Sequence, residues 1–85
     1  MATVTLRYWA AAKDAAGAAE QRVSADTLAA ALAAATGPDG GGKLKLVLPR
    51  CSFLIDGAPV GLRAADSVLL ADGNVIEVLP PFAGG

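Results

Sequence analysis

Two short apolar segments, one near each end of the chain, place the strongest constraint on its fold. Across residues 3–9 apolar and polar side chains alternate, so that Val4, Leu6 and Tyr8 fall on one face. This period of two predicts a half-buried strand. Val75–Leu79 predicts a second apolar strand. These are the most apolar strands of the chain, and we expect them to lie together in the middle of one sheet.

The clearest helix spans residues 27–36, where Leu28 and Leu32 lie one turn apart and form an apolar stripe. Asp26 or Thr27 can accept hydrogen bonds from the free amides at its start. The other expected elements are a short alanine-rich helix over residues 10–16 stopped by Gly17, a strand over 19–24, a glycine-rich loop over 38–43, a helical turn over 44–48 ended by Pro49, a strand over 52–55 followed by an Asp56-Gly57 turn, an edge strand over 60–63, and a turn over 72–74.

This order of elements predicts an α+β fold of the β-grasp type, a mixed sheet with one main helix packed on one face. Periodicity alone leaves other α+β topologies open. A chain of 85 residues forms one domain. We expect a β-grasp domain over residues 1–81 and a flexible C-terminal tail over residues 82–85.

Composition excludes several classes of function. The chain is 54% hydrophobic and 18% charged with a net charge of −1, which argues against disorder and against a nucleic-acid binder with a basic stripe. It has no apolar run of the ~20 residues that a membrane span needs, and its start does not read as a signal peptide. With a single cysteine, the sequence therefore predicts a cytoplasmic protein that binds neither nucleic acid nor membrane.

The residues that most catalytic sites need are missing. The chain has no histidine, which removes Ser-His-Asp and Cys-His arrangements and the usual zinc sites, so we expect no metal. Its aspartates occur singly, mostly beside turn residues, and are interpreted as turn and cap residues. Residues 37–43 match most of the phosphate-loop pattern, but Leu44 replaces the magnesium-binding Ser or Thr and the segment follows a helix. We interpret it as a connector.

Cys51 and Trp9 each have a functional and a packing interpretation. As a nucleophile, Cys51 lacks a neighbouring base and an assignable helix N-terminus. Free cysteine is among the most buried residue types, so the core interpretation is preferred. Trp9 could contact a partner, but a lone tryptophan at a strand end is usually packing.

The end of the chain is its most unusual part. Pro80 and Pro81 stop the last strand and stiffen its exit. The six residues that remain from Pro80 onward span at most ~20 Å when extended. Gly84 and Gly85 carry no side chain, so this strip can enter a channel that any Cβ would block. A frayed terminus is the alternative reading; under the functional one, the reactive group is the α-carboxylate of Gly85.

The segment Asp72-Gly73-Asn74-Val75-Ile76-Glu77-Val78-Leu79-Pro80-Pro81-Phe82-Ala83-Gly84-Gly85 resembles the C-terminal part of the MoaD/ThiS sulfur carriers, which are ubiquitin-like. Residues 4–13 and 27–32 look like the first strand, short helix and main helix of that family. Within it, the double proline is most similar to the small subunits of molybdopterin synthase. The glycine-rich loop and Phe82 depart from the usual pattern.

The resemblance implies a specific chemistry at Gly85. A separate E1-like adenylating enzyme, which consumes ATP, would adenylate Gly85, and a sulfur donor protein would convert it to a thiocarboxylate. The tail would then enter the large subunit of molybdopterin synthase, in a heterotetramer of two small and two large subunits. There, two sulfurs would form the dithiolene of molybdopterin from cyclic pyranopterin monophosphate. The carrier itself would bind no cofactor and would be no enzyme on its own. The implied tail and partner-binding residues are Pro80, Pro81, Phe82, Ala83 and Gly84.

Three alternatives stay open from the sequence. A sister carrier would serve thiamine thiazole or cysteine biosynthesis. A ubiquitin-like modifier would use the same adenylation to join Gly85 to lysines of target proteins. A plain β-grasp interaction module would have an incidental Gly-Gly end.

Overall fold

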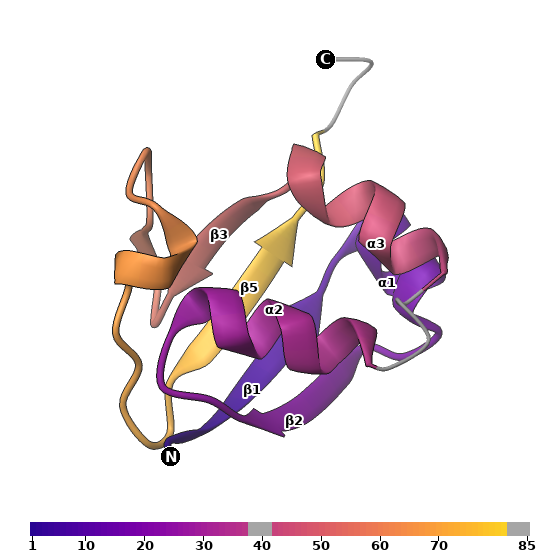
Figure 1. Cartoon of the computed structure of the whole chain (residues 1–85). Helices are drawn as coiled ribbons and strands as arrows, with labels where there is room; N and C mark the ends of the chain where they lie inside the picture. Colours follow the sequence, from indigo (N-terminus) through magenta and orange to yellow (C-terminus); the bar gives the residue numbers. More distant parts are fainter. Residues whose placement is uncertain (38–41, 82–85) are drawn as a thin grey trace.

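The computed structural model describes residues 1–37 and 42–81, and within them five strands form one mixed sheet in the order β2-β1-β5-β3-β4 (Figure 1). β1 and β5 pair in parallel, and the other neighbours pair antiparallel. The first and last strands therefore lie side by side inside the sheet, as predicted. The strands are β1 (Thr3–Tyr8), β2 (Glu20–Ser24), β3 (Ser52–Ile55), β4 (Ala58–Pro59) and β5 (Val75–Leu79).

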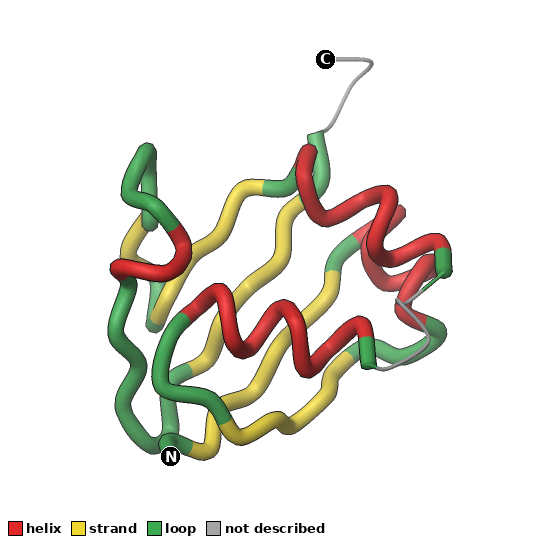
Figure 2. The backbone as a smooth tube through the Cα atoms, viewed as in Figure 1, coloured by secondary structure: helices red, strands yellow, loops and turns green. Residues whose placement is uncertain are grey.

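Helices cover one face of this sheet, with α2 crossing it diagonally (Figure 2). They are α1 (Ala10–Ala16), α2 (Leu28–Thr36) and α3 (Lys43–Val47), with two 3₁₀ turns, η1 (Leu48–Arg50) and η2 (Ala65–Ser67). This is the predicted β-grasp arrangement. No helix in the described part of the chain is long and apolar enough to cross a membrane.

The main helix starts at one of its two predicted caps. The hydroxyl oxygen of Thr27 accepts a hydrogen bond from the Ala30 amide at 3.1 Å. The carboxylate of Asp26 instead accepts from the amide of Ala2 at 3.2 Å, which ties the start of α2 to the N-terminus. Leu28 is buried, and the small alanines that follow let the helix lie close to the sheet.

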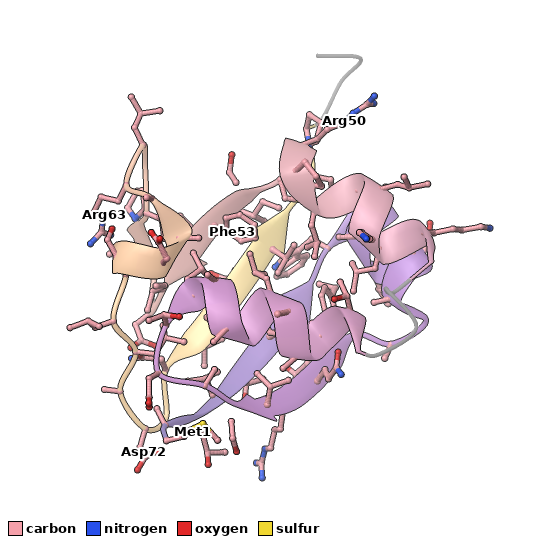
Figure 3. All side chains as sticks on the ribbon, viewed as in Figure 1. Met1, Arg50, Phe53, Arg63 and Asp72 are labelled. Carbon is pink, nitrogen blue, oxygen red and sulfur yellow. The ribbon has the colours of Figure 1, made fainter. Side chains whose placement is uncertain are left out.

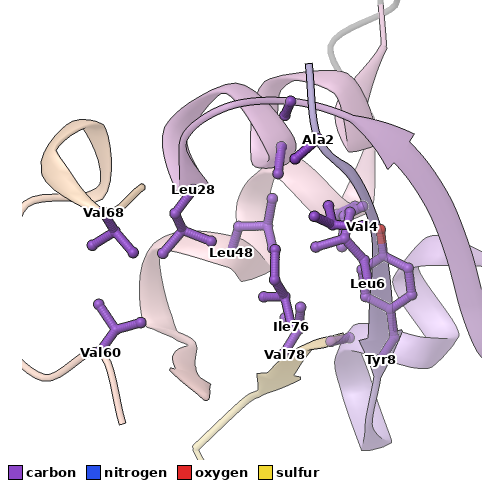
Figure 4. Packing of buried hydrophobic residues seen from close by; sticks show 14 residues of the cluster. Ala2, Val4, Leu6, Tyr8, Leu28, Leu48, Val60, Val68, Ile76 and Val78 are labelled. Atoms are coloured by element: carbon purple, nitrogen blue, oxygen red, sulfur yellow. The ribbon is translucent and has the colours of Figure 1, made fainter. Parts of the chain in front are cut away.

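The core lies between α2 and the two central strands (Figure 4). Leu6 faces Ile76 in the parallel register, and both are fully buried. Val4 and Val78 are also buried, at 1% and 0% exposure. The prediction that these four side chains share one core is confirmed.

Two boundaries differ from the prediction. Pro49 does not end the helical segment. It stands in the first turn of η1, where backbone amides have no acceptor within the helix, so the missing amide proton of proline is tolerated. The edge strand is β4 and not residues 60–63: the tight turn at Asp56-Gly57 places Ala58 directly opposite Ile55. The chain curls away after β4, and the Arg63 guanidinium donates to the carbonyls of Val60 and Pro59.

Two predictions fall outside the described residues. The glycine-rich loop lies mostly in residues 38–41, between α2 and α3, and the flexible tail lies in residues 82–85. The loop's flanks are described: the amide of Gly37 donates to the carbonyl of Ala33 and caps α2. The interpretation of residues 37–43 as a connector agrees with this position between two helices.

Candidate functional site

The last strand carries the end of the chain out from the middle of the sheet. β5 lies between β1 and β3, and its last residue, Leu79, faces Ser52 in the antiparallel register. On the other side the amide of Trp9 donates to the carbonyl of Val78 at 3.2 Å. β5 is therefore paired on both sides almost to its end, which fixes the base of the tail.

The two prolines form the exit itself. Pro80 is buried and Pro81 is exposed, so the chain passes from the interior to the surface between them. Neither proline has an amide proton, and sheet pairing cannot continue through them. The structure thus places these two predicted site residues together at the end of the central strand.

A hollow of about 440 Å³ adjoins the exit and is lined by side chains of α1, α3, η1 and the prolines. Its rim includes Leu46, whose side chain is 76% exposed. Helical positions two apart point to different sides, so of Leu44 and Leu46 only one can enter the core. Leu44 does so, at 3% exposure. We did not single out Leu46 or Arg50 from the sequence, although this spacing could have indicated Leu46. The lining residues are Ala11, Leu46, Val47, Arg50, Pro80 and Pro81.

Cys51 lies close to this exit, one residue before β3. Its side chain is half-buried against the core, and its thiol donates to the carbonyl of Val47 at 3.4 Å. Burial raises the pKa of the Cys51 thiol, which keeps it protonated near neutral pH and makes it a weak nucleophile. The packing interpretation of Cys51 is confirmed.

Trp9 is less covered than its packing interpretation requires. It precedes α1 and is 44% exposed. It lines an open hollow of about 620 Å³ together with two basic and two acidic side chains. One pair of these is joined, Arg7 Nε to Glu20 Oε2, at 3.0 Å. The four charged residues are Arg7, Lys13, Asp14 and Glu20.

The described acidic side chains form no metal site, and two of them hold turns. Within residues 1–37 and 42–81, no group of three or more Cys, Asp or Glu side chains could hold a metal ion. Asp56 and Asp72 accept backbone hydrogen bonds at turns, from Val75 at 2.9 Å and Thr3 at 2.7 Å, as their turn interpretation predicts. The remaining predicted site residues, Phe82, Ala83, Gly84 and Gly85, lie outside the described part of the chain.

Comparisons with known proteins point to one family. A family model described as the ThiS family matches residues 6–85. The solution structure of small archaeal modifier protein 1 from Methanosarcina acetivorans is 27% identical, with a TM-score of 0.84, and the match covers 100% of this chain and 98% of that chain. No match was found among curated proteins.

Two further solved structures are related to molybdopterin-converting factor. The complex of its subunits 1 and 2 from Helicobacter pylori contains a chain 25% identical, with a TM-score of 0.70, covering 98% of this chain and 99% of that one. A putative subunit 1 from Pyrococcus furiosus is 18% identical with a TM-score of 0.77, covering 96% and 100%, and it shows the fold alone.

Proposed function

The chain belongs to the ThiS family, and from this premise we propose that it is a sulfur carrier whose working group is the α-carboxylate of Gly85. One observation carries the proposal: the central strand of the sheet ends at a proline exit, and the family match runs through that exit to the last residue. A catalytic site on the body is not needed for this function.

The chemistry at Gly85 requires activation by another enzyme. The carboxylate attacks the α-phosphorus of ATP, releasing pyrophosphate and leaving an acyl-adenylate. A sulfur donor, such as a protein-bound persulfide, then attacks the carbonyl carbon and displaces AMP. Reductive cleavage of the sulfur–sulfur bond by a thiol leaves a C-terminal thiocarboxylate, which is a soft, anionic nucleophile.

We assign the carrier to molybdopterin formation as the small subunit of molybdopterin synthase. The similarity to a chain of the Helicobacter pylori complex supports a large-subunit partner. The large subunit would supply the pocket and the acid-base groups, in a heterotetramer of two small and two large subunits. The other partners are an E1-like adenylating enzyme and a sulfur donor protein, all in the cytoplasm. The carrier holds no cofactor, since ATP is consumed by the activating enzyme.

Reconstitution tests this function. The purified protein is incubated with an E1-like activating enzyme, ATP and a persulfide donor, and its intact mass is measured. We expect replacement of one oxygen by sulfur, located at Gly85 by fragmentation, and then dithiolene formation when the large subunit and cyclic pyranopterin monophosphate are added. Sulfur found on Cys51 instead of Gly85 would reject the proposal.

Protein modification is the second candidate function. The likeness to small archaeal modifier protein 1, at 27% identity over the whole chain, favours it. Both functions begin with adenylation of Gly85, so they differ only in the acceptor. Mass analysis of lysines from the cells that make this protein distinguishes them: Gly-Gly remnants on target lysines indicate conjugation, whereas a thiocarboxylate without such remnants indicates sulfur carriage.

A further inference from the structure

One short helical segment beside the proline exit is rich in basic residues. The continuous segment formed by α3 and η1 carries three of the seven basic residues of the chain and no acidic one. This segment borders the hollow at the proline exit. Figure 3 shows Arg50 at the end of the body where the last described residues lie. We name the exposed side chains Lys43, Lys45, Leu46 and Arg50 the basic rim.

Carboxylates gather at the other end of the sheet. Asp26, Asp56 and Asp72 accept hydrogen bonds from backbone amides at the starts of β1 and β5. Because β1 and β5 run parallel, these starts lie opposite the exit; Figure 3 shows Asp72 there. Three of the eight acidic residues of the chain therefore lie at the end of the sheet opposite the basic rim.

The cations of the basic rim are available to a partner. Lys45 and Arg50 are exposed and form no ion pair with another described residue, the one such pair being Arg7–Glu20. The hollow beside Trp9 differs, since its two cations are accompanied by two carboxylates. The described side chains of α3 and η1 thus carry positive charge only, and this surface adjoins the proline exit at Arg50 and at Leu46, a largely exposed apolar side chain.

We propose that the basic rim docks on an acidic protein surface that surrounds the mouth of the channel receiving the tail. This inference rests on the proposed function and adds the chemistry of the partner's surface to it. Carboxylates around the mouth would attract Lys45 and Arg50 and orient the body during encounter, since complementary charge acts mainly on the association rate. Leu46 would enter an apolar depression between those carboxylates.

A phosphate-bearing partner fits this surface less well. Binding to nucleic acid or to an anionic membrane relies on many basic contacts, and the rim offers three cations on a chain of net charge −1. Once the tail is inserted, an acidic mouth is also compatible with the anionic end of the tail, which then lies well beyond the mouth. Six residues reach ~20 Å, more than twice the Debye length of about 8 Å at physiological salt.

Association kinetics with the purified large subunit of molybdopterin synthase from the same cells test the proposal. Arg50→Glu and Arg22→Glu change the net charge equally, and Arg22 is an exposed residue of β2 that lines a separate hollow with Asp72. At low salt we expect the association rate of Arg50→Glu to fall ~10-fold and that of Arg22→Glu to change less than ~2-fold. The difference should disappear at high salt. Leu46→Ala should instead raise the dissociation rate.

The outcomes separate the two proposals. Melting temperatures of all variants are compared with the wild type, and Lys45→Glu repeats the test at a second rim position. If wild type binds the large subunit but Arg50→Glu and Arg22→Glu slow it equally, or if Arg50→Glu binds faster, the acidic mouth is rejected while the carrier function stands. If the wild type does not bind the large subunit, the acidic mouth and the assignment to molybdopterin synthase both fail, whereas sulfur carriage at Gly85 is decided by the reconstitution experiment. The acidic mouth is also rejected if the rim substitutions weaken binding to DNA or to phosphatidylserine vesicles but leave binding to the large subunit unchanged.

Discussion

Single residues in this protein divide between those that the proposed chemistry needs and those that hold the body together. The terminal glycines belong to the first group and follow the last described buried residue, Pro80. Buried side chains such as Leu6 and Ile76 belong to the second. Substitutions in the two groups should therefore affect different measurements.

Changing the terminal glycines should abolish sulfur transfer without unfolding the protein. Removing Gly85 leaves the carboxylate one residue, or ~3.4 Å, short of its working position, and a displacement of that size can cost orders of magnitude in rate. Gly84→Phe adds a side chain where a channel should admit only backbone. The free energy of unfolding should change by no more than ~0.5 kcal/mol, as for surface substitutions. Melting temperature and thiocarboxylate formation are measured on each variant; transfer at the wild-type rate by the Gly85 deletion would contradict the mechanism.

Cys51→Ser should give the opposite result. Burial raises the pKa of the Cys51 thiol, so it is protonated near neutral pH, and we expect it not to carry the sulfur. Replacing the half-buried thiol by a hydroxyl should destabilise the fold by about 1 kcal/mol, while Gly85 still becomes thiolated. Denaturant unfolding and intact mass check this, with Cys51→Ala as the matched apolar control. Loss of thiolation in both variants, at intact fold, would make Cys51 the candidate carrier.

At the scale of elements, the Asp56-Gly57 turn connects the β3–β4 hairpin to the start of β5. The Asp56 carboxylate accepts from the Val75 amide at 2.9 Å and from the Asn74 side-chain amide at 2.6 Å. Asp56 also has a positive φ of 50°, and Gly57 has a φ of 86°. The turn thus combines a left-handed backbone with hydrogen bonds to the strand that leads to the exit.

Asp56→Ala should destabilise the protein by about 2 kcal/mol. It removes two hydrogen bonds and places an alanine in the left-handed region. Asp56→Asn is the matched control, because asparagine tolerates positive φ and keeps an acceptor for Val75; we expect a loss below ~1 kcal/mol. Urea unfolding compares the two. Equal losses for alanine and asparagine would contradict the roles assigned to the left-handed backbone and to the hydrogen bond from Val75.

The elements most visible in the sequence are those with strong local signals. β1 and α1 were predictable from alternation, alanine content and the stop at Gly17. β4 was misplaced because a strand of two residues has no period to read, and its position depends on the tight turn before it. The end of the helical turn was predicted wrongly at Pro49, because proline is equally compatible with the end of one helix and the start of the next.

At the scale of the whole molecule, the described residues pack around one small core, so the stability of the protein should depend strongly on the central strand. Ile76→Ala should cost about 4 kcal/mol, as for other large-to-small changes at buried positions, and this is a large share of the stability of a small domain. Val75→Ala is the control, since Val75 is only half-buried on the adjacent position of the same strand. Thermal unfolding should show a much larger loss for Ile76→Ala. Similar losses in both would mean that the core is not centred on β5.

The surface at this scale could not be read from the sequence. Leu46 and Arg50 lie well before β5 in the sequence, and only the packing of α3 and η1 beside the end of β5 brings them to the exit. The exposure of Trp9 likewise depends on how α1 turns away after β1. The proline exit was predictable, because Pro80 and Pro81 directly follow the last strand in the sequence; the rim around it was not.

The intact mass of the protein isolated from its own cells tests the central claim most directly. If Gly85 is the sulfur carrier, part of the population should have a mass higher by one sulfur minus one oxygen, and fragmentation should place this gain on the C-terminal residue. Cells lacking the activating enzyme should yield only the unmodified carboxylate. A population that never shows the gain under conditions of active molybdopterin synthesis, or a gain located elsewhere in the chain, would contradict the proposed function.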